Sequence, residues 1–226
     1  WTTWRPFSRC RLATMSSTYN SPYNLARRTQ STDIISGGRL IINIVSSFNP
    51  AVAVNFGSEP LPPRDIRYAK AREFLDVAKK LWASWDPRRE GEVPPERFWD
   101  AAQAAAIEHV GDHFSVKGPL NVPRGPQGHP VIAQAGGSKS GRTIAATHAD
   151  TIVAAPNGVA AMKQYRDDVR AQMAAMGRDP DSCKILFLLS PVVAETEDQA
   201  KWFADQRRVS AEQNLGIQLH GGFHIW

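Results

Sequence analysis

Residues 111–142 read GDHFSVKGPLNVPRGPQGHPVIAQAGGSKSGR, a ribbon rich in proline and glycine that leads into a short apolar strand and then a helix. The strand stops at Gly136, Gly137 and Ser138, and a helical pattern starts at Lys139. A helix that starts at such a turn leaves backbone N–H groups without acceptors at the positive end of its dipole. The turn therefore fits an anion, most often a phosphate. It fits equally well a tight turn in which Ser138 is an ordinary N-cap.

The alternation of strand and helix continues on both sides of this stretch. Strands are expected at residues 12–17, 40–45, 130–135, 150–155 and 184–189. Helices are expected at residues 22–35, 65–85, 138–147, 159–176 and 196–209, with a shorter one within 95–107. Pro22 opens the first helix, Gly37 and Gly38 stop it, and Thr196 and Gln199 have the spacing of a capping box. Five strand–helix units indicate an α/β fold, either a doubly wound sheet or an eight-fold barrel.

Two of the strands are apolar almost throughout. The run LIINIV at residues 40–45 is predicted to be buried on both faces, as in a parallel sheet. The run KILFLL at residues 184–189 is also predicted to be a buried strand. Asn43 lies inside the first run, where its amide needs either a partner in the interior or a ligand.

The composition argues against several classes of protein. The chain has 226 residues, 42% apolar and 22% charged, as in an ordinary globular protein. No stretch approaches the roughly 20 apolar residues of a membrane helix, and two cysteines provide neither a disulfide framework nor a metal quartet. The net charge of +5 comes from scattered residues, so no nucleic-acid partner is expected. His109 and His113, like His220 and His224, have helical ligand spacing but no third ligand, so no metal site is predicted.

In both candidate folds, ligands bind at the carboxyl ends of the parallel strands. The residues expected at those ends are 17–20, 43–47, 136–138 and 155–157. They are mostly small and polar and include no cluster of acids, which suits a polar cofactor better than a divalent metal.

Six blocks of the sequence carry a family resemblance. They are SSTYNSPYNLAR (16–27), SGGR (36–39), NIVSSFNPAVAVNFG (43–57), RYAKAREFLDVAKKLWASWD (67–86), HFSVKGPLNVPRGPQGHPVIAQAGGSKSGR (113–142) and SPVVAETEDQA (190–200). These blocks resemble the nitrilotriacetate monooxygenase group, a branch of the bacterial luciferase-like flavin monooxygenases. The resemblance implies a TIM barrel that receives reduced FMN from a separate NAD(P)H-dependent flavin reductase. It implies oxidation of a small organic substrate by O2 through a flavin C4a-peroxide, in a homo-oligomer when full length. A cytoplasmic location is expected.

The resemblance also implies the cofactor-binding residues, but no catalytic side chain. The implied residues are Ser17, Thr18, Asn43, Tyr68, Gly137 and Ser138. The first two match a strand end near the isoalloxazine ring, and the last two match the phosphate-binding turn. Asn43 matches an Asn that contacts the flavin, and Tyr68 matches the Tyr of a His-Asp-Glu-Arg-Tyr motif beside it.

The chain departs from the family pattern in its motifs and its length. Arg64 stands in place of the motif His, and Leu40-Ile41-Ile42 replaces the usual small-Gly-Trp run. Only five of the eight strands of a barrel are expected, so we interpret the chain as a fragment of a longer protein or a truncated copy. The expected organisation is a partial luciferase-like barrel over 12–209 with an insertion at 87–130, flanked by unassigned segments 1–11 and 210–226.

Two alternatives remain beside the monooxygenase. One is a luciferase-like oxidoreductase that uses a deazaflavin and transfers a hydride, although the GPLNVPRGPQG ribbon favours the monooxygenase branch. The other is a non-catalytic remnant, which the missing strands and the replaced His favour.

Overall fold

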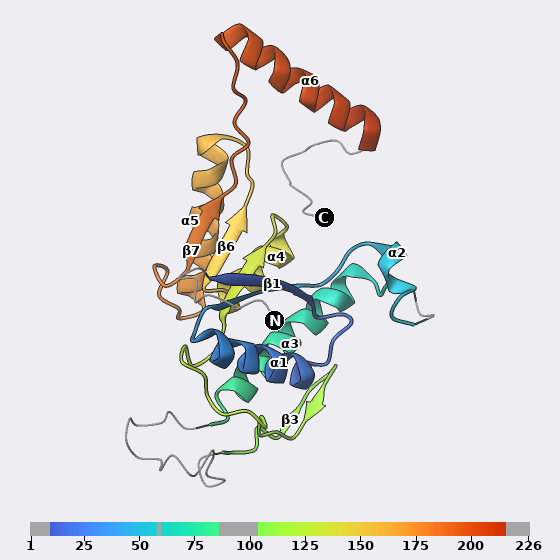
Figure 1. The fold of residues 1–226 in the computed structure, drawn as a ribbon, viewed down its shortest axis with the longest axis vertical. Coiled ribbons are helices and arrows are strands. Elements are labelled where there is room, and N and C mark those ends of the chain that lie inside the picture. The colour runs from blue at the N-terminus through green and yellow to red at the C-terminus, as the bar shows by residue number, and fades with distance from the viewer. Residues whose placement is uncertain (1–9, 58–59, 86–103, 216–226) are drawn as a thin grey trace, which may run out of the picture. The chain divides into compact units, whose positions relative to one another are not determined.

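The structure is a computed structural model that describes residues 10–57, 60–85 and 104–215 (Figure 1). The main sheet contains β1 (Arg11–Ser16), β2 (Leu40–Val45), β5 (Val131–Ala135), β6 (Thr151–Ala154) and β7 (Lys184–Phe187), in the order β1-β2-β5-β6-β7. The β1–β2, β2–β5 and β6–β7 pairs are parallel. A separate antiparallel pair consists of β3 (His109–Val110) and β4 (Ser115–Val116). The helices are α1 (Pro22–Ser36), α2 (Pro50–Ala53), α3 (Arg64–Trp82), α4 (Lys139–His148), α5 (Gly158–Ala175) and α6 (Glu197–Leu215).

The predicted alternation of strands and helices is confirmed, and most boundaries agree within three residues. Helix α6 is longer than predicted and continues to Leu215. The short elements α2, β3 and β4 were not predicted. Of the short helix expected within 95–107, residues 104–107 are not helical, and the rest lies outside the described residues.

The helix ends form as the local sequence predicts. Gly37 caps α1 in the left-handed conformation, with φ 67°, which glycine adopts without a steric penalty. Thr196 caps α6, because the backbone N–H of Gln199 donates to its Oγ1 at 3.3 Å. These caps end α1 and begin α6 where the sequence pattern predicts.

The chain divides into two compact units. The first comprises residues up to Gln134 together with His148–Asp150, and the second comprises Ala135–Thr147 and the residues from Thr151 onward. Helices α1 and α3 pack together in the first unit (Figure 1). Trp82 of α3 is buried there and donates from Nε1 to the carbonyl of Ala26 in α1 at 3.1 Å. The apolar core of this unit therefore lies between the two helices and β2.

Burial of β2 alternates along the strand, so the prediction of burial on both faces is wrong. Leu40, Ile42 and Ile44 are buried, whereas the residues between them are only half-buried. Side chains of a strand point alternately to its two faces, and only one face of β2 is fully covered within the described residues. Asn43 lies on the other, half-buried face.

The carboxylate of Glu73 in α3 binds the short hairpin of β3 and β4. Its carboxylate accepts hydrogen bonds from the backbone N–H groups of His113 and Phe114, both at 2.9 Å, and lies 3.0 Å from Nε2 of His109. Burial would raise the pKa of this carboxyl, but the hydrogen bonds from His109, His113 and Phe114 outweigh it and lower the pKa. The short hairpin depends on this carboxylate from a distant helix, which explains why local sequence did not predict it.

The second unit is built around α5 and the strands β6 and β7. Tyr165, Val169 and Met173 of α5 are buried, and they belong to the apolar stripe expected on this helix. The prediction that residues 184–189 form a buried strand is wrong in its burial. Leu186 and Leu189 are 56% and 72% exposed. Strand β7 is the last in the sheet order and pairs only with β6 among the described residues, so the sheet covers it on one edge only.

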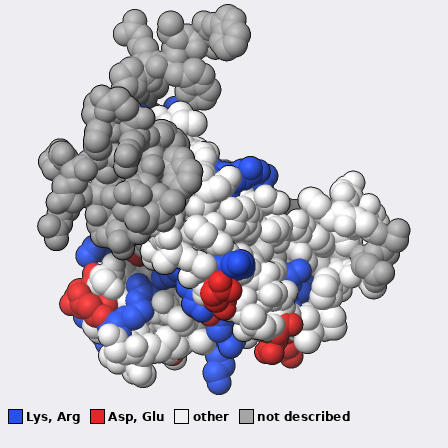
Figure 2. Space-filling model, turned by 90° about the horizontal axis from the view of Figure 1, so that it is seen from below, with Lys and Arg blue, Asp and Glu red and all other residues white. Residues whose placement is uncertain are grey.

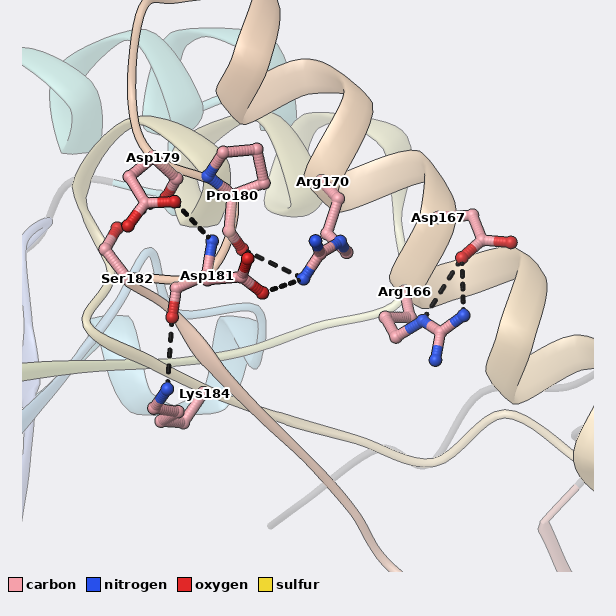
Figure 3. Close-up of polar contacts among 8 residues, drawn as sticks. All are labelled: Arg166, Asp167, Arg170, Asp179, Pro180, Asp181, Ser182 and Lys184. Carbon is pink, nitrogen blue, oxygen red and sulfur yellow. Dashed lines mark hydrogen bonds and ion pairs between the residues drawn. The ribbon is translucent and has the colours of Figure 1, made fainter.

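An exposed ion pair joins α5 to the loop between α5 and β7. Arg170 of α5 contacts the Oδ1 of Asp181 at 2.5 Å, and Asp179 accepts from the backbone N–H of Asp181 at 2.9 Å (Figure 3). Arg166 and Asp167 form a second exposed pair on the same helix. The hydrogen bond from Arg170 lowers the pKa of Asp181. These contacts lie at the solvent surface, so they contribute little to stability.

The surface carries charges of both signs. On the face drawn in Figure 2, Lys and Arg side chains are interspersed with Asp and Glu. Within the part of the chain that the structure describes, no helix is both long and apolar enough to cross a membrane.

Candidate functional site

A glycine turn joins β5 to α4 at residues 136–138, called here the 136–138 turn. Ser138 caps the helix, because its Oγ accepts the backbone N–H of Gly141 at 3.2 Å. Outside the immediate chain neighbours, no described atom lies within 4 Å of the position that a Cβ on Gly136 or Gly137 would occupy. The N-cap is thus formed, and the space beside the glycines is open to a ligand.

Two side chains bind the carbonyl oxygens of this turn. The hydroxyl of Tyr165 donates to the carbonyl of Gly136 at 2.9 Å, and Nη1 of Arg142 donates to the carbonyl of Gly137 at 2.6 Å. In a trans peptide the C=O and the N–H point in opposite directions. The N–H groups of the next residues, Gly137 and Ser138, are therefore directed away from Arg142 and Tyr165.

Arg142 is itself held in place. Its Nε lies 2.5 Å from the Oδ2 of Asp168 in α5, and its guanidinium lies 5.8 Å from the centre of the Tyr165 ring. Burial raises the pKa of Tyr165 to about 12, so its hydroxyl remains a donor at neutral pH. The turn is supported by a connected set of polar groups rather than by a single contact.

The turn also has the electrostatics of an anion site. The first N–H groups of a helix have no intrahelical acceptor and carry the positive end of the helix dipole. The side chains that contact the turn bring one positive charge, from Arg142, and Asp168 balances that charge. Recognition of an anion at this place would therefore come chiefly from oriented backbone N–H groups.

Ser17 and Thr18 lie where β1 ends, in the first unit, and their hydroxyls bind backbone. Ser17 is fully buried, and its Oγ donates to the carbonyl of Val45 at 3.2 Å. Thr18 donates from Oγ1 to the carbonyl of Ser46 at 2.7 Å. Both hydroxyls thus connect the segment after β1 to the end of β2.

Asn43 stands in the middle of β2, in register with Thr14 of β1 and Ala133 of β5. Its Nδ2 donates to Oγ1 of Thr14 at 3.3 Å. Its Oδ1 is enclosed but accepts no hydrogen bond within the described residues. An enclosed acceptor without a donor is costly, so this oxygen is a candidate to receive an N–H from a ligand.

Tyr68 lies in the second turn of α3 and is half-buried. The guanidinium of Arg64 lies 5.5 Å from the centre of its ring, within the range of a cation–π contact. Arg64, the residue in place of the family His, therefore sits beside the Tyr of the same motif.

Several site residues were not predicted from sequence. Arg67 and Lys70 of α3 reach the segments after β2 and β1, where Nη1 of Arg67 lies 3.3 Å from the carbonyl of Ser46 and Nζ of Lys70 lies 3.1 Å from that of Thr18. The position of Arg142 could have indicated a contact with the turn, because it lies four residues after Ser138 and so one helical turn away. The signal of Tyr165 was hidden, because its position belongs to an apolar stripe.

Of the four histidines with helical ligand spacing, the structure describes His109 and His113. Among the described residues, no group of three or more His, Cys, Asp and Glu could hold a metal ion. His109 lies between Glu73 and Lys80, with its Nδ1 3.2 Å from the Lys80 Nζ. His220 and His224 lie outside the described residues.

Comparison with known proteins identifies the family. The chain is 42% identical over 191 residues to nitrilotriacetate monooxygenase component A of Aminobacter aminovorans, which covers 84% of this chain and 42% of that protein. The EDTA monooxygenase of Chelativorans sp. BNC1 superposes with a TM-score of 0.76 at 34% identity, over 92% of this chain and 51% of that one. A riboflavin lyase solved with a modified FMN and riboflavin superposes with a TM-score of 0.73 at 31% identity, over 88% and 45%.

The chain spans about half the length of the curated relatives it matches. The structural neighbours are luciferase-like TIM barrels, and this chain covers 46% and 51% of two of them. Together with the parallel sheet of five strands, this match confirms the predicted α/β partial barrel. Residues 8–215 match the sequence profile described as luciferase-like monooxygenase. The chain belongs to the luciferase-like monooxygenase family.

Proposed function

We propose that this chain is the flavin-binding part of a two-component monooxygenase that uses reduced FMN and O2 to oxidise a small organic substrate. The observation that carries the proposal is the 136–138 turn, where Arg142 and Tyr165 bind the carbonyls and the N–H groups face the opposite way. Relatives named as monooxygenases support the reaction, and the riboflavin lyase with a modified FMN supports the cofactor.

The residues present fit FMN at two places. The 136–138 turn offers backbone N–H groups and open space beside Gly137, which suit a phosphate. The Oδ1 of Asn43 lacks a donor, and a flavin ring carries N–H groups that could supply one. In the second unit, we assign Gly137 and Ser138 to a phosphate. In the first unit, we assign Asn43 and Tyr68 to a flavin ring.

Ser17 and Thr18 have a different role in this proposal. Their hydroxyls already donate to the carbonyls of Val45 and Ser46, so they retain only acceptor lone pairs for a ligand. We assign them to shaping the segment beside the flavin ring. When bound, the reduced flavin supplies the reaction with O2 and the transfer of one oxygen atom to the substrate. The protein binds and orients the flavin and excludes water from it.

The partners follow from the two-component relatives. Component A in the name of the Aminobacter aminovorans protein implies a second component, and we propose a separate NAD(P)H-dependent flavin reductase that delivers FMNH2. We also propose a cytoplasmic homo-oligomer for the full-length protein.

Fluorescence titration of the purified chain with FMN, riboflavin and a deazaflavin tests the proposal. We expect micromolar affinity for FMN and weaker binding of the other two. Preferential retention of the deazaflavin would contradict the monooxygenase and support hydride transfer. Binding of FMN without substrate oxidation, when a flavin reductase, NADH and O2 are added to a panel of candidate substrates, would support a non-catalytic remnant.

A further inference from the structure

We propose that Ser47, Arg67 and Lys70 form an anion site at the carboxyl ends of β1 and β2, and that this site binds a carboxylate of the organic substrate. All three residues lie in the first unit, whereas the 136–138 turn lies in the second. The anion site follows from the geometry of these residues, and its assignment to the substrate rests on the proposed function above.

The hydroxyl of Ser47 has a proton to donate to a ligand. Its Oγ lies 2.8 Å from the Oγ of Ser16, and by distance alone either atom could be the donor. The Ser16 Oγ accepts the backbone N–H groups of Thr18 at 3.1 Å and Tyr19 at 3.4 Å, which use both of its lone pairs. Ser16 therefore donates its own proton to Ser47. The O–H of Ser47 has no acceptor within the described residues, so a bound acceptor can receive it.

The backbone of Ser47 is an independent sign of a functional position. Its φ is 56°, in the left-handed region that residues other than glycine rarely adopt. Such a conformation is strained, and it persists only where the surrounding structure imposes it. Strained residues of this kind are concentrated at ligand sites. Ser47 also follows directly on the segment after β2, at the edge of a parallel sheet where barrels bind their ligands.

Two cations of α3 supply the positive charge. Nη1 of Arg67 lies 3.3 Å from the carbonyl of Ser46, and Nζ of Lys70 lies 3.1 Å from that of Thr18. Both cations are half-buried, and within the described residues neither forms an ion pair, not even with Asp65 in the first turn of α3. A partly desolvated charge without a counterion favours the binding of an anion.

The hydroxyl and the two charges converge on one place. The Ser46 carbonyl belongs to the peptide group that leads into Ser47, and the contact between Ser16 and Ser47 joins this segment to the end of β1. A guanidinium has five N–H donors and an ammonium has three, so both cations keep donors beyond those that bind carbonyls. A carboxylate can accept from the hydroxyl and from a cation at once. Hydrogen bonds to a charged acceptor are roughly twice as strong as those to a neutral one, so the site should reject an uncharged amide.

Titration of the whole chain with glutarate, a dicarboxylate, and with glutaramide, its neutral diamide, tests the proposal. Backbone amide NMR shifts of Ser47 and Thr18 report the place of binding, and FMN affinity is measured separately by fluorescence. We expect glutarate to bind at least about ten-fold more tightly than glutaramide. Arg67→Met and Lys70→Met should each weaken glutarate by about five-fold, with FMN affinity within about two-fold of the parent.

Ser47→Gly separates binding from folding. It removes the hydroxyl, and glycine adopts a positive φ without strain. We expect about three-fold weaker binding of glutarate and a melting temperature no lower than that of the parent chain. A lower melting temperature with unchanged glutarate affinity would show that Ser47 serves the fold, and would overturn its role in binding.

Arg72→Met is the matched control for charge. It removes an exposed arginine from the same helix, and glutarate affinity should stay within about two-fold of the parent. Equal affinity for glutarate and glutaramide would overturn the inference, as would shifts confined to Gly137 and Ser138. Equal losses of glutarate and FMN in Lys70→Met would overturn the assignment to the substrate. Glutarate binding by a chain that does not bind FMN would refute the proposed flavin function and leave the anion site in place.

Discussion

The segments that follow β5 and β1 use their polar side chains in opposite ways. After β5, Tyr165 and Arg142 donate to backbone carbonyls, and the N–H groups of the turn face the other side. After β1, the hydroxyls of Ser17 and Thr18 donate to carbonyls at the end of β2, and the segment is bound into the fold by its own side chains. The first segment exposes backbone to a ligand, and the second uses its hydroxyls for internal connections.

The difference shows that a cluster of hydroxyl residues is not by itself a binding surface. The segment after β1 is the richer in Ser and Thr, yet Ser17 is fully buried. The 136–138 turn has a single hydroxyl, and that hydroxyl caps α4. The groups suited to a phosphate belong to the backbone, where a glycine keeps the approach open.

The largest expected effect on FMN affinity comes from filling the space beside Gly137. Gly137→Val should weaken FMN binding by about 100-fold, since its branched side chain would occupy the space that a phosphate needs. The free protein should keep its melting temperature, because no described atom beyond the chain neighbours lies within 4 Å of the new Cβ. Fluorescence titration and thermal melts measure the two quantities.

Gly137→Ala is the matched control for size. Its single methyl group should weaken FMN binding by a smaller factor, about ten-fold. Affinity of the valine variant equal to that of the parent chain would show that the phosphate does not approach this turn. A lowered melting temperature in both variants would instead show that the glycine serves the fold.

A smaller effect concerns the hydroxyl of Tyr165, and it depends on pH. The raised pKa of about 12 means that the folded protein holds the proton more tightly than the unfolded chain, whose pKa is near 10. The resulting stability is complete below pH 10 and is lost as the pH rises toward 12, by about 1.4 kcal/mol at pH 11. Tyr165→Phe should lack this loss, so its unfolding free energy should fall less between pH 9 and about 11.

Urea unfolding of parent and variant across that pH range measures the difference. At neutral pH the variant should be less stable by about 1 kcal/mol, because the carbonyl of Gly136 loses its donor. Parallel stability curves for the two proteins would mean that Tyr165 titrates normally and that its hydroxyl is not an enclosed donor. The turn after β5 would then lose one of its two supports, and the comparison between the segments would weaken.

Much of this fold was predictable because its signals are local. The strand runs, Gly37 after α1 and the Thr196 cap each lie within a few residues of the structure that they determine. Burial was less predictable, since LIINIV and KILFLL look alike, and only their places in the sheet separate the alternating β2 from the exposed β7. Short elements such as β3 were missed because Glu73, 36 residues away from His109, holds them.

The candidate site shows the same distinction between features set by local sequence and features set by distant elements. Ser138 was predictable, because capping is decided by its own turn. The carbonyls of that turn are bound by Arg142, one helical turn later, and by Tyr165 of α5. The sequence did not predict these contacts, because an arginine or a tyrosine in a helix can make many other interactions. The sequence also placed Ser17 and Thr18 at a strand end, but the direction in which a hydroxyl donates is decided by the neighbouring strand.

The smallest expected effect tests the segment after β1. Thr18→Val keeps the shape of the side chain and removes the donor to the carbonyl of Ser46, a bond of 2.7 Å. That carbonyl retains Nη1 of Arg67 at 3.3 Å, so it does not become unsatisfied, and the loss of unfolding free energy should be about 1 kcal/mol. FMN affinity should change by less than about three-fold, since the hydroxyl is already committed to backbone. A ten-fold loss of FMN affinity, with stability unchanged, would show instead that Thr18 contacts the flavin directly.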